Sequence, residues 1–352
     1  MVPGRLETLT GGYEYDRRIV AGLRALGHAV TVRELDDSFP RPTEAARADA
    51  TAALAQIPDR SLVLIDGLAF GAMPAEAERE ARRLRLVAIV HHPLADETGL
   101  EAGTAVQLAE SERRALAFVR KVIVTSDPTA LNLLKYGVER DRIVVVEPGT
   151  DRAPLAKGSQ GRFVQLLSVA TLVPRKGHET LIGALARITS REWRLICVGS
   201  LTRDTRTVDR VRTLLRSRGI EDRVSLVGEV EGAPLAAYYD SADVFVLPTF
   251  HEGYGMAVAN ALARGLPIVS TNTGAIPALV DAQSTMPAGL LLPPGDEPAW
   301  AAALKRIVEE PAVREQYAEG ARRVREKLAT WEDAAARMSA ALESIGDDHR
   351  QT

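Results

Sequence analysis

Short apolar runs alternate with longer segments of helical periodicity along the whole chain. Such alternation is typical of parallel sheets covered by helices on both faces. In the first half, apolar runs predict strands at residues 29–32, 61–65, 86–90, 121–124 and 143–146, with helices between them such as residues 13–26. A second series is predicted at residues 163–169, 194–198, 224–227, 244–247, 267–270 and 289–292. We therefore expect an α/β protein with two Rossmann-like domains in tandem.

The domain boundary is marked by a polar stretch, residues 156–162, which contains two glycines and reads as a linker. The expected domains are residues 1–154 and residues 160–325. Residues 300–309, 313–328 and 331–345 carry apolar residues at three- and four-residue spacing, which predicts helices. We expect the last of them, in a segment of about 330–352, to cross back to the first domain. Ligands of such sheets bind outside the carboxyl ends of the strands, which places the expected site in a cleft between facing domains.

The N-terminal edge departs from this plan. A strand of about five residues should open a Rossmann-like domain, yet only Met1 and Val2 precede Pro3 and Gly4. Either a first strand is missing because of a late start, or residues 2–9 form a short, irregular substitute.

Composition narrows the function classes. The chain has 352 residues, 44 basic against 47 acidic side chains and a net charge of -3, so no global positive field favours nucleic acid or an anionic membrane surface. The single cysteine, Cys197, lies in an apolar run; it excludes an internal disulfide and favours a reducing compartment. No apolar stretch approaches the roughly 20 residues of a membrane span, and no signal peptide is evident. We expect a cytoplasmic protein without a transmembrane segment.

The strongest chemical signal follows the predicted strand 244–247, in the segment LPTFHEGYGMAVANALARGLPIVST. Gly253 and Gly255 permit backbone angles closed to other residues and let a ligand approach the main chain. The amides that open the next helix favour an anion such as a diphosphate. Glu252 can accept hydrogen bonds from sugar hydroxyls beside that diphosphate. The alternative is an ordinary strand-turn-helix corner with a solvated glutamate.

A second signal follows the first strand of the second domain, where Arg175 and Lys176 are adjacent. Two cations at a carboxyl end can neutralise the charge that builds up on a departing nucleotide diphosphate, a task that a metal ion performs elsewhere. A solvated basic turn is the alternative. The Arg175-Lys176 pair and Glu252 each follow a strand of the same domain. This shared position favours the functional interpretation.

Together these motifs resemble those of glycosyltransferase family 4. The resemblance extends over nearly the whole chain, from the glycine pair Gly11-Gly12 through Lys176-Gly177 to the Glu-Gly-Tyr-Gly loop of residues 252–255 and the string ARGLPIV of residues 263–269. It implies the GT-B fold and a retaining hexosyltransferase that uses a nucleotide-diphosphate sugar, UDP-sugar or GDP-sugar, with no metal and no other cofactor. In this mechanism the leaving phosphate accepts the proton of the acceptor on the same face of the sugar.

The resemblance also implies residue roles. Arg175 and Lys176 would hold the diphosphate, Glu252 the transferred sugar, and His91 would lie beside the reacting sugar. The remaining implied donor contacts are the glycine pair Gly11 and Gly12, main-chain groups at Gly228 to Val230 for the base, and the loop residues Gly253, Tyr254, Gly255 and Met256.

Two positions depart from the family pattern. Asn260 stands where the family repeats a glutamate that grips the ribose diol, and an amide lacks the stronger charge-assisted hydrogen bond. Thr171 stands at the position of a family arginine, for which Arg175 would compensate. Both residues are retained as donor-binding candidates.

Other interpretations stay open at this point. His91 and His92 suggest a metal, but no third ligand lies at recognisable spacing, so no metal site is predicted. A sugar-nucleotide epimerase of the same architecture and a non-catalytic nucleotide-sugar-binding protein are alternatives. The acceptor can be a small molecule, a glycan or a lipid, and no nucleic-acid partner or oligomeric state is predicted. Thr125, Ser126 and Asp127 end a predicted strand and are expected to cap the helix that begins near Pro128, with acceptor binding as the alternative. The arginine-rich segment 203–218 is expected to be a solvated helical face.

Overall fold

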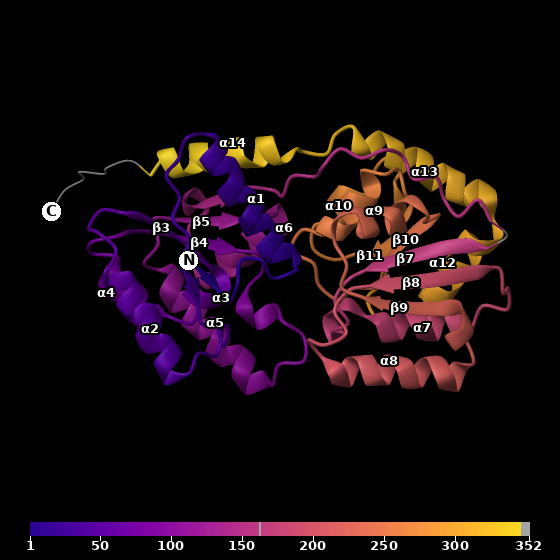
Figure 1. Ribbon diagram of the computed structural model, residues 1–352, viewed down its shortest axis with the longest axis horizontal. Helices are drawn as coiled ribbons and strands as arrows, with labels where there is room; N and C mark the ends of the chain where they lie inside the picture. The colour runs from indigo at the N-terminus through magenta and orange to yellow at the C-terminus, as the bar shows by residue number, and fades with distance from the viewer. Residues whose placement is uncertain (162, 346–352) are drawn as a thin grey trace. The chain divides into compact units, whose positions relative to one another are not determined.

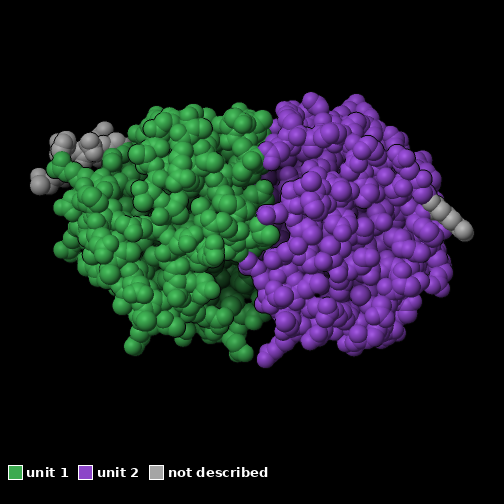
Figure 2. Space-filling model, viewed as in Figure 1, with its two compact units in different colours: residues 1–149, 329–352 green, residues 150–328 purple. Residues whose placement is uncertain are grey.

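The computed structural model describes residues 1–161 and 163–345. The chain forms two compact units, one from residues 1–149 and the C-terminal segment that begins at residue 329, the other from residues 150–328 (Figure 2). The expected domains, 1–154 with about 330–352 and 160–325, differ from these units at their edges. The polar segment before Phe163 is held by unit 2, where Lys157 Nζ pairs with Asp240 at 2.8 Å. Residues 162 and 346–352 of the expected segments lie outside the described residues.

Unit 1 is built on parallel strands. A four-stranded sheet has the order β3-β4-β5-β6, and β1 pairs with β2 in a short separate ladder. The α-amino group of Met1 donates to the Leu64 carbonyl at 2.6 Å, and Asp66 N donates to the Met1 carbonyl at 3.0 Å, the pattern of a parallel pair. The carboxyl ends of β1, β3 and β4 therefore share one edge. The strands are β1 (Val2–Pro3), β2 (Glu34–Leu35), β3 (Leu62–Asp66), β4 (Arg85–Val90), β5 (Lys121–Val124) and β6 (Ile143–Val145).

The predicted strand at residues 29–32 is wrong. Pairing starts only where Val2 N donates to Arg33 O and Gly4 N to Leu35 O, and the β1 strand that supplies these groups has two residues. The first strand is thus short, with two residues, and residues 4–9 contain no strand. The other predicted strands are present, with ends that shift by no more than one residue.

The C-terminal helix belongs to unit 1. Its residues pack along α1, as Figure 1 shows, and a side chain at Gly22 would collide with Ala335. The prediction that this helix returns to the first domain is confirmed for its described residues. The helices of unit 1 are α1 (Gly11–Ala25), α2 (Glu44–Ala55), α3 (Gly67–Phe70), α4 (Pro74–Glu80), α5 (Ala102–Leu116), α6 (Asp127–Leu133) and α14 (Trp331–Glu343), with 3₁₀ turns η1 (Leu94–Asp96), η2 (Leu134–Tyr136) and η3 (Arg140–Arg142).

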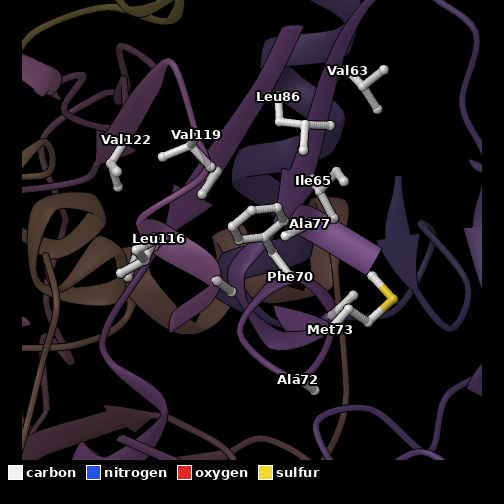
Figure 3. Close-up of a cluster of buried hydrophobic side chains, with 14 of the residues drawn as sticks. Val63, Ile65, Phe70, Ala72, Met73, Ala77, Leu86, Leu116, Val119 and Val122 are labelled. Atoms are coloured by element: carbon white, nitrogen blue, oxygen red, sulfur yellow. The ribbon is translucent and has the colours of Figure 1, made fainter. Parts of the chain in front are cut away.

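One buried hydrophobic cluster of unit 1 joins its sheet to α2, α3 and α5. Val63 and Ile65 alternate along β3 toward Phe70 and Met73, and Leu86 of β4 joins them (Figure 3). Phe70 and Met73 are each 1% exposed. Apolar burial of this kind contributes about 25 cal/mol per Å² and fixes the strands whose ends carry the polar residues described below.

Unit 2 contains a six-stranded parallel sheet in the order β12-β11-β10-β7-β8-β9. Strand order runs outward from the centre in both directions, so the topological switch point lies between β7 and β10, where ligands of doubly wound sheets bind. The strands are β7 (Val164–Val169), β8 (Trp193–Val198), β9 (Val224–Gly228), β10 (Val244–Leu247), β11 (Ile268–Thr271) and β12 (Gly289–Leu292).

Helices cover both faces of this sheet. Figure 1 shows α7 and α8 on one side and α9, α10 and α13 on the other. Successive strand residues divide between the two cores: Leu166 faces the α7 and α8 side and Leu167 the opposite side. Cys197 is buried in β8, as predicted. The helices are α7 (His178–Ala186), α8 (Thr205–Arg218), α9 (Gly232–Asp240), α10 (Met256–Leu262), α11 (Ile276–Leu279), α12 (Glu297–Glu309) and α13 (Pro311–Arg325), with 3₁₀ turns η4 (Pro174–Lys176) and η5 (Glu221–Arg223).

None of the helices in the described part of the chain combines the length and apolar character of a membrane span.

Candidate functional site

The switch point of unit 2 brings the two strongest sequence motifs together. β7 and β10 are adjacent in the sheet, with Val244 beside Leu166. The turn that carries Arg175 and Lys176 follows β7, and the loop that carries Glu252 follows β10. Because both strands are parallel, the two loops meet at the same edge.

The turn after β7 is held close to β10 by a glycine. Gly177 has a φ of +68°, which only glycine adopts at no cost. A Cβ at this position would collide with the carbonyl oxygen of Pro248, the first residue after β10. This approach ends η4 and starts α7, and it aims Lys176 at the neighbouring loop.

Lys176 and Glu252 form an ion pair in which Lys176 Nζ donates to Glu252 Oε1. Their side chains are 17% and 10% exposed. Burial opposes ionisation of Glu252 more than any other single influence, but Lys176 and Arg175 together lower its pKa below the ordinary value. Glu252 is therefore an ionised, nearly buried carboxylate at the switch point, with two cations beside it.

Arg175 has a second task that the sequence did not reveal. Its guanidinium donates to the His251 carbonyl at 2.9 Å, and its own carbonyl accepts from Phe250 N at 2.7 Å and from the Thr249 hydroxyl at 3.1 Å. These contacts bind the η4 turn to the loop after β10. Arg175 thus orders the loop that carries Glu252 and adds positive charge to the site.

The Glu-Gly-Tyr-Gly loop is shaped by close main-chain approaches. A side chain at Gly274 would collide with the Glu252 carbonyl. Gly255 is the N-cap of α10 and has a φ of +104°. Tyr254 is 7% exposed and packs in the apolar core, so its side chain is structural. Met256 opens α10, and Asn260 follows one turn later on the same face of the helix.

The remaining donor-binding candidates of unit 2 also lie at carboxyl ends of strands. Thr171 comes two residues after β7, Gly228 ends β9 with φ +92°, and Val230 follows it. The Gly228 carbonyl accepts from Gly199 N at 2.9 Å, which links the ends of β9 and β8.

In unit 1 the glycine pair and His91 are brought together. Gly11 and Gly12 open α1, and a Cβ at Gly12 would lie 3.4 Å from His91 Cδ2. His91 directly follows β4, and its ring meets the ring of Tyr15 edge to face, with centroids 5.4 Å apart.

Two carboxylates that the sequence analysis missed face His91. Its Nε2 lies 3.6 Å from Asp16 Oδ1 and 3.5 Å from Asp66 Oδ2, and the two aspartates are 4% and 5% exposed. Burial would lower the pKa of His91, but Asp16 and Asp66 outweigh it and raise that pKa to about 10. Burial also raises the pKa of Asp16, against the opposing influence of His91. Asp66 ends a strand, much as His91 directly follows one, so its position in the sequence could have identified it. Asp16 lies within a helix, and no feature of the sequence identified it.

The three residues are close enough for a metal, since their ligand atoms lie within 4.8 Å of one another. The His91 imidazole already faces both carboxylates as a cation. Burial lowers the pKa of the Met1 α-amino group, against the smaller raising influence of Asp16 and Asp66. His92 takes no part and instead lies 3.6 Å from Glu97.

Two structural interpretations from the sequence are confirmed. Ser126 is the N-cap of α6, where its hydroxyl accepts from Thr129 N. Helix α8 carries its arginines on an exposed face, with Asp204 as N-cap and Arg210 paired to Glu179 at 2.9 Å.

Two family models match segments of this chain. A model described as glycosyl transferases group 1 matches residues 164–310, and one described as glycosyltransferase family 4 matches residues 45–153. The chain therefore carries a glycosyltransferase family 4 domain and a glycosyl transferases group 1 domain. These models describe glycosyltransferases and do not favour the epimerase or the binding protein.

The chain is similar to several proteins that are named as glycosyltransferases. It is 27% identical to the MMP alpha-(1->4)-mannosyltransferase of Mycolicibacterium hassiacum over 73% of the chain, and 29% identical to the D-inositol 3-phosphate glycosyltransferase of Kineococcus radiotolerans over 61%. The matches span 65% and 54% of these relatives' own length.

Solved structures show that the fold is GT-B. Sucrose-phosphate synthase from Thermosynechococcus elongatus matches with a TM-score of 0.79, 21% identity and 98% coverage of both chains. Anabaena HepE, in complex with UDP-glucose, matches with a TM-score of 0.76 and 18% identity over 97% of this chain and 98% of HepE.

Proposed function

We propose that this protein is a retaining, metal-independent glycosyltransferase that moves a hexose from a nucleotide-diphosphate sugar to an acceptor. The observation that carries the proposal is the nearly buried Lys176–Glu252 pair, with Arg175 beside it, at the switch point of unit 2. The family matches support the activity, and the UDP-glucose complex of HepE supports a nucleotide-sugar donor.

Unit 2 is the proposed donor unit. Lys176 and Arg175 would neutralise the diphosphate of a UDP-sugar or GDP-sugar, and Glu252 would accept hydrogen bonds from hydroxyls of the sugar. Main-chain groups of residues 253–256 would contact sugar and phosphate, those of residues 228–230 would contact the base, and Asn260 and Thr171 would contribute weaker polar contacts. No other cofactor is needed.

The proposed chemistry places most of the catalytic effect on the leaving group. The bond between the anomeric carbon and the phosphate oxygen breaks, a bond to the acceptor oxygen forms on the same face, and the departing phosphate takes the acceptor's proton. Charge that develops on the phosphate is stabilised by fixed cations and amides, which act without reorganisation. A double displacement of the glycosidase type needs two carboxylates about 5 Å apart, whereas Glu252 is the buried carboxylate that the described residues place at this edge.

Unit 1 is the proposed acceptor unit. Its proposed ligand contacts are His91 and the glycine pair Gly11 and Gly12. The acceptor is a small molecule, a glycan or a lipid. A cytoplasmic location completes the proposal and fits the single buried cysteine.

A thermal-shift screen with UDP-glucose, GDP-mannose and ADP-glucose tests the donor site, because a bound ligand raises stability by mass action. We expect one nucleotide class to stabilise the protein equally with and without EDTA, and release of the matching nucleoside diphosphate to continue in EDTA. Activity that EDTA abolishes and magnesium or manganese restores would disprove metal independence. Absence of any stabilisation would disprove the donor site.

A further inference from the structure

His91 is held by carboxylates from two different elements. Asp16 comes from α1 and Asp66 from the end of β3, while His91 follows β4. Both carboxylates approach the same ring nitrogen, Nε2, at 3.6 and 3.5 Å. At these lengths the contacts are ion pairs and exceed normal hydrogen-bond distance.

The orientation of the imidazole is fixed from more than one side. Tyr15 meets it edge to face at an interplanar angle of 86°, and Gly12 lies beside Cδ2, where a Cβ would be in van der Waals contact at 3.4 Å. Asp66 is itself held, because its Oδ1 accepts from Leu68 N at 2.8 Å as the N-cap of α3. With Nε2 facing the carboxylates, Nδ1 is the nitrogen left for a ligand, and the side chain is 19% exposed.

Both oxygens of Asp16 are buried and have no hydrogen-bond partner among the described residues. A buried carboxylate in that condition is costly unless a cation compensates it. The groups that face this cluster are Asp16 and Tyr15 on α1, Asp66 at the end of β3 and the α-amino group of Met1 before β1. A positively charged ring is the arrangement that balances two aspartates here.

We propose that Asp16 and Asp66 are positioning residues that hold His91 as an imidazolium through Nε2 and thereby present Nδ1–H to a hydroxyl or anionic oxygen of the ligand. A neutral ring with its proton on Nε2 would offer only an acceptor at Nδ1. The two carboxylates thus convert His91 from an acceptor into a charged donor. The role of the ligand as sugar or phosphate rests on the proposed function, whereas the charge state of His91 does not.

The raised pKa of His91, about 10, supports this assignment and makes it measurable. Nuclear magnetic resonance on protein labelled with ¹⁵N in its histidine rings, assigned with His91→Gln, reports the charge of both nitrogens without substrate. We expect wild-type His91 to remain doubly protonated from pH 6 to 8.5. In the double variant Asp16→Asn/Asp66→Asn, the pKa of His91 should fall toward the ordinary value of about 6.5. In each single variant, the pKa of His91 should lie between the values of the wild type and the double variant.

Glu97→Gln supplies the matched control, because it removes a carboxylate beside the adjacent His92 and should leave the His91 titration unchanged. Wild-type His91 that titrates near pH 6.5, or an unchanged titration in Asp66→Asn, would overturn the proposal. Displacement of the wild-type His91 signals by magnesium, manganese or zinc would also overturn it, since the aspartates would then hold a metal. If Asp16→Asn does not fold, the wild type and Asp66→Asn alone decide.

Turnover gives the second readout. If the glycosyltransferase proposal holds, kcat of Asp16→Asn/Asp66→Asn should fall at least tenfold as the pH rises from 6 to 8.5, while kcat of the wild type stays level. A charged His91 in the spectra of a protein that transfers no sugar would count against the glycosyltransferase proposal alone. A neutral His91 in an active enzyme would count against the positioning role alone.

Discussion

Replacing Lys176 with alanine removes the cation that directly contacts Glu252. If Lys176 also stabilises charge on the leaving diphosphate, the loss in turnover should be about 10²- to 10³-fold, the cost of removing one preorganised donor. Breaking a buried pair costs about 3–5 kcal/mol of stability, and we expect the lower end, because Arg175 remains near Glu252 and the Glu252 side chain is 10% exposed.

The two effects separate in a double variant. In Lys176→Ala/Glu252→Gln no buried charge is left uncompensated, so the free energy of unfolding in urea should recover most of its loss. Release of nucleoside diphosphate from the stabilising sugar nucleotide should stay low. Lys157→Ala is the control: its pair with Asp240 is exposed, so stability should change by less than about 1 kcal/mol and turnover should be unchanged. Turnover of Lys176→Ala within a few-fold of wild type would refute the assignment.

Three further predictions concern stability. Burial raises the pKa of Glu112 to about 8, so the fold keeps a proton that the unfolded chain loses above about pH 4.5, and stability from this group falls by about 1.4 kcal/mol per pH unit between pH 5 and 8. Glu112→Gln should abolish that fall in urea titrations; an unchanged slope would contradict it. Burial, with a smaller contribution from Lys176, lowers the pKa of His178 to about 4, so the unfolded chain takes up a proton first and stability falls as pH drops from about 6.5 to 4. His178→Leu should remove this loss, because neither ring nitrogen has a partner among the described residues. Gly177→Ala should cost well over 2 kcal/mol and abolish donor-induced thermal shifts, while Gly219→Ala, at φ +64° with open space, should cost only about 1–2 kcal/mol; equal melting temperatures would refute the collision argument.

Much of the architecture was predictable because burial on both faces makes strands of a parallel sheet continuously apolar. Such runs identified β3 to β12. The predicted strand at residues 29–32 is absent for a physical reason. An apolar run forms a strand only where a neighbouring strand supplies backbone N–H and C=O groups, and β1 supplies those of two residues. Strand order, and with it the switch point, cannot be read from apolar pattern.

The site was predictable where chemistry follows a strand directly. Lys176 and Glu252 were found in this way, and the structure places them in contact. The loop-binding contacts of Arg175 and the part played by Asp16 depend on which elements lie side by side, and in sequence Asp16 reads as a polar residue between Tyr15 and Arg17. The roles assigned to the donor-binding residues stay predictions.

The return of α14 to α1 gives the chain an order of assembly. Unit 2 is continuous in sequence, whereas unit 1 consists of two stretches separated by all of unit 2. During synthesis, unit 2 can complete its sheet before α14, which begins at Trp331, is available to cover the apolar side of α1. We therefore expect residues 150–328 to be the part that can be excised as a domain, and residues 1–149 alone to expose the apolar residues that α14 covers and to aggregate.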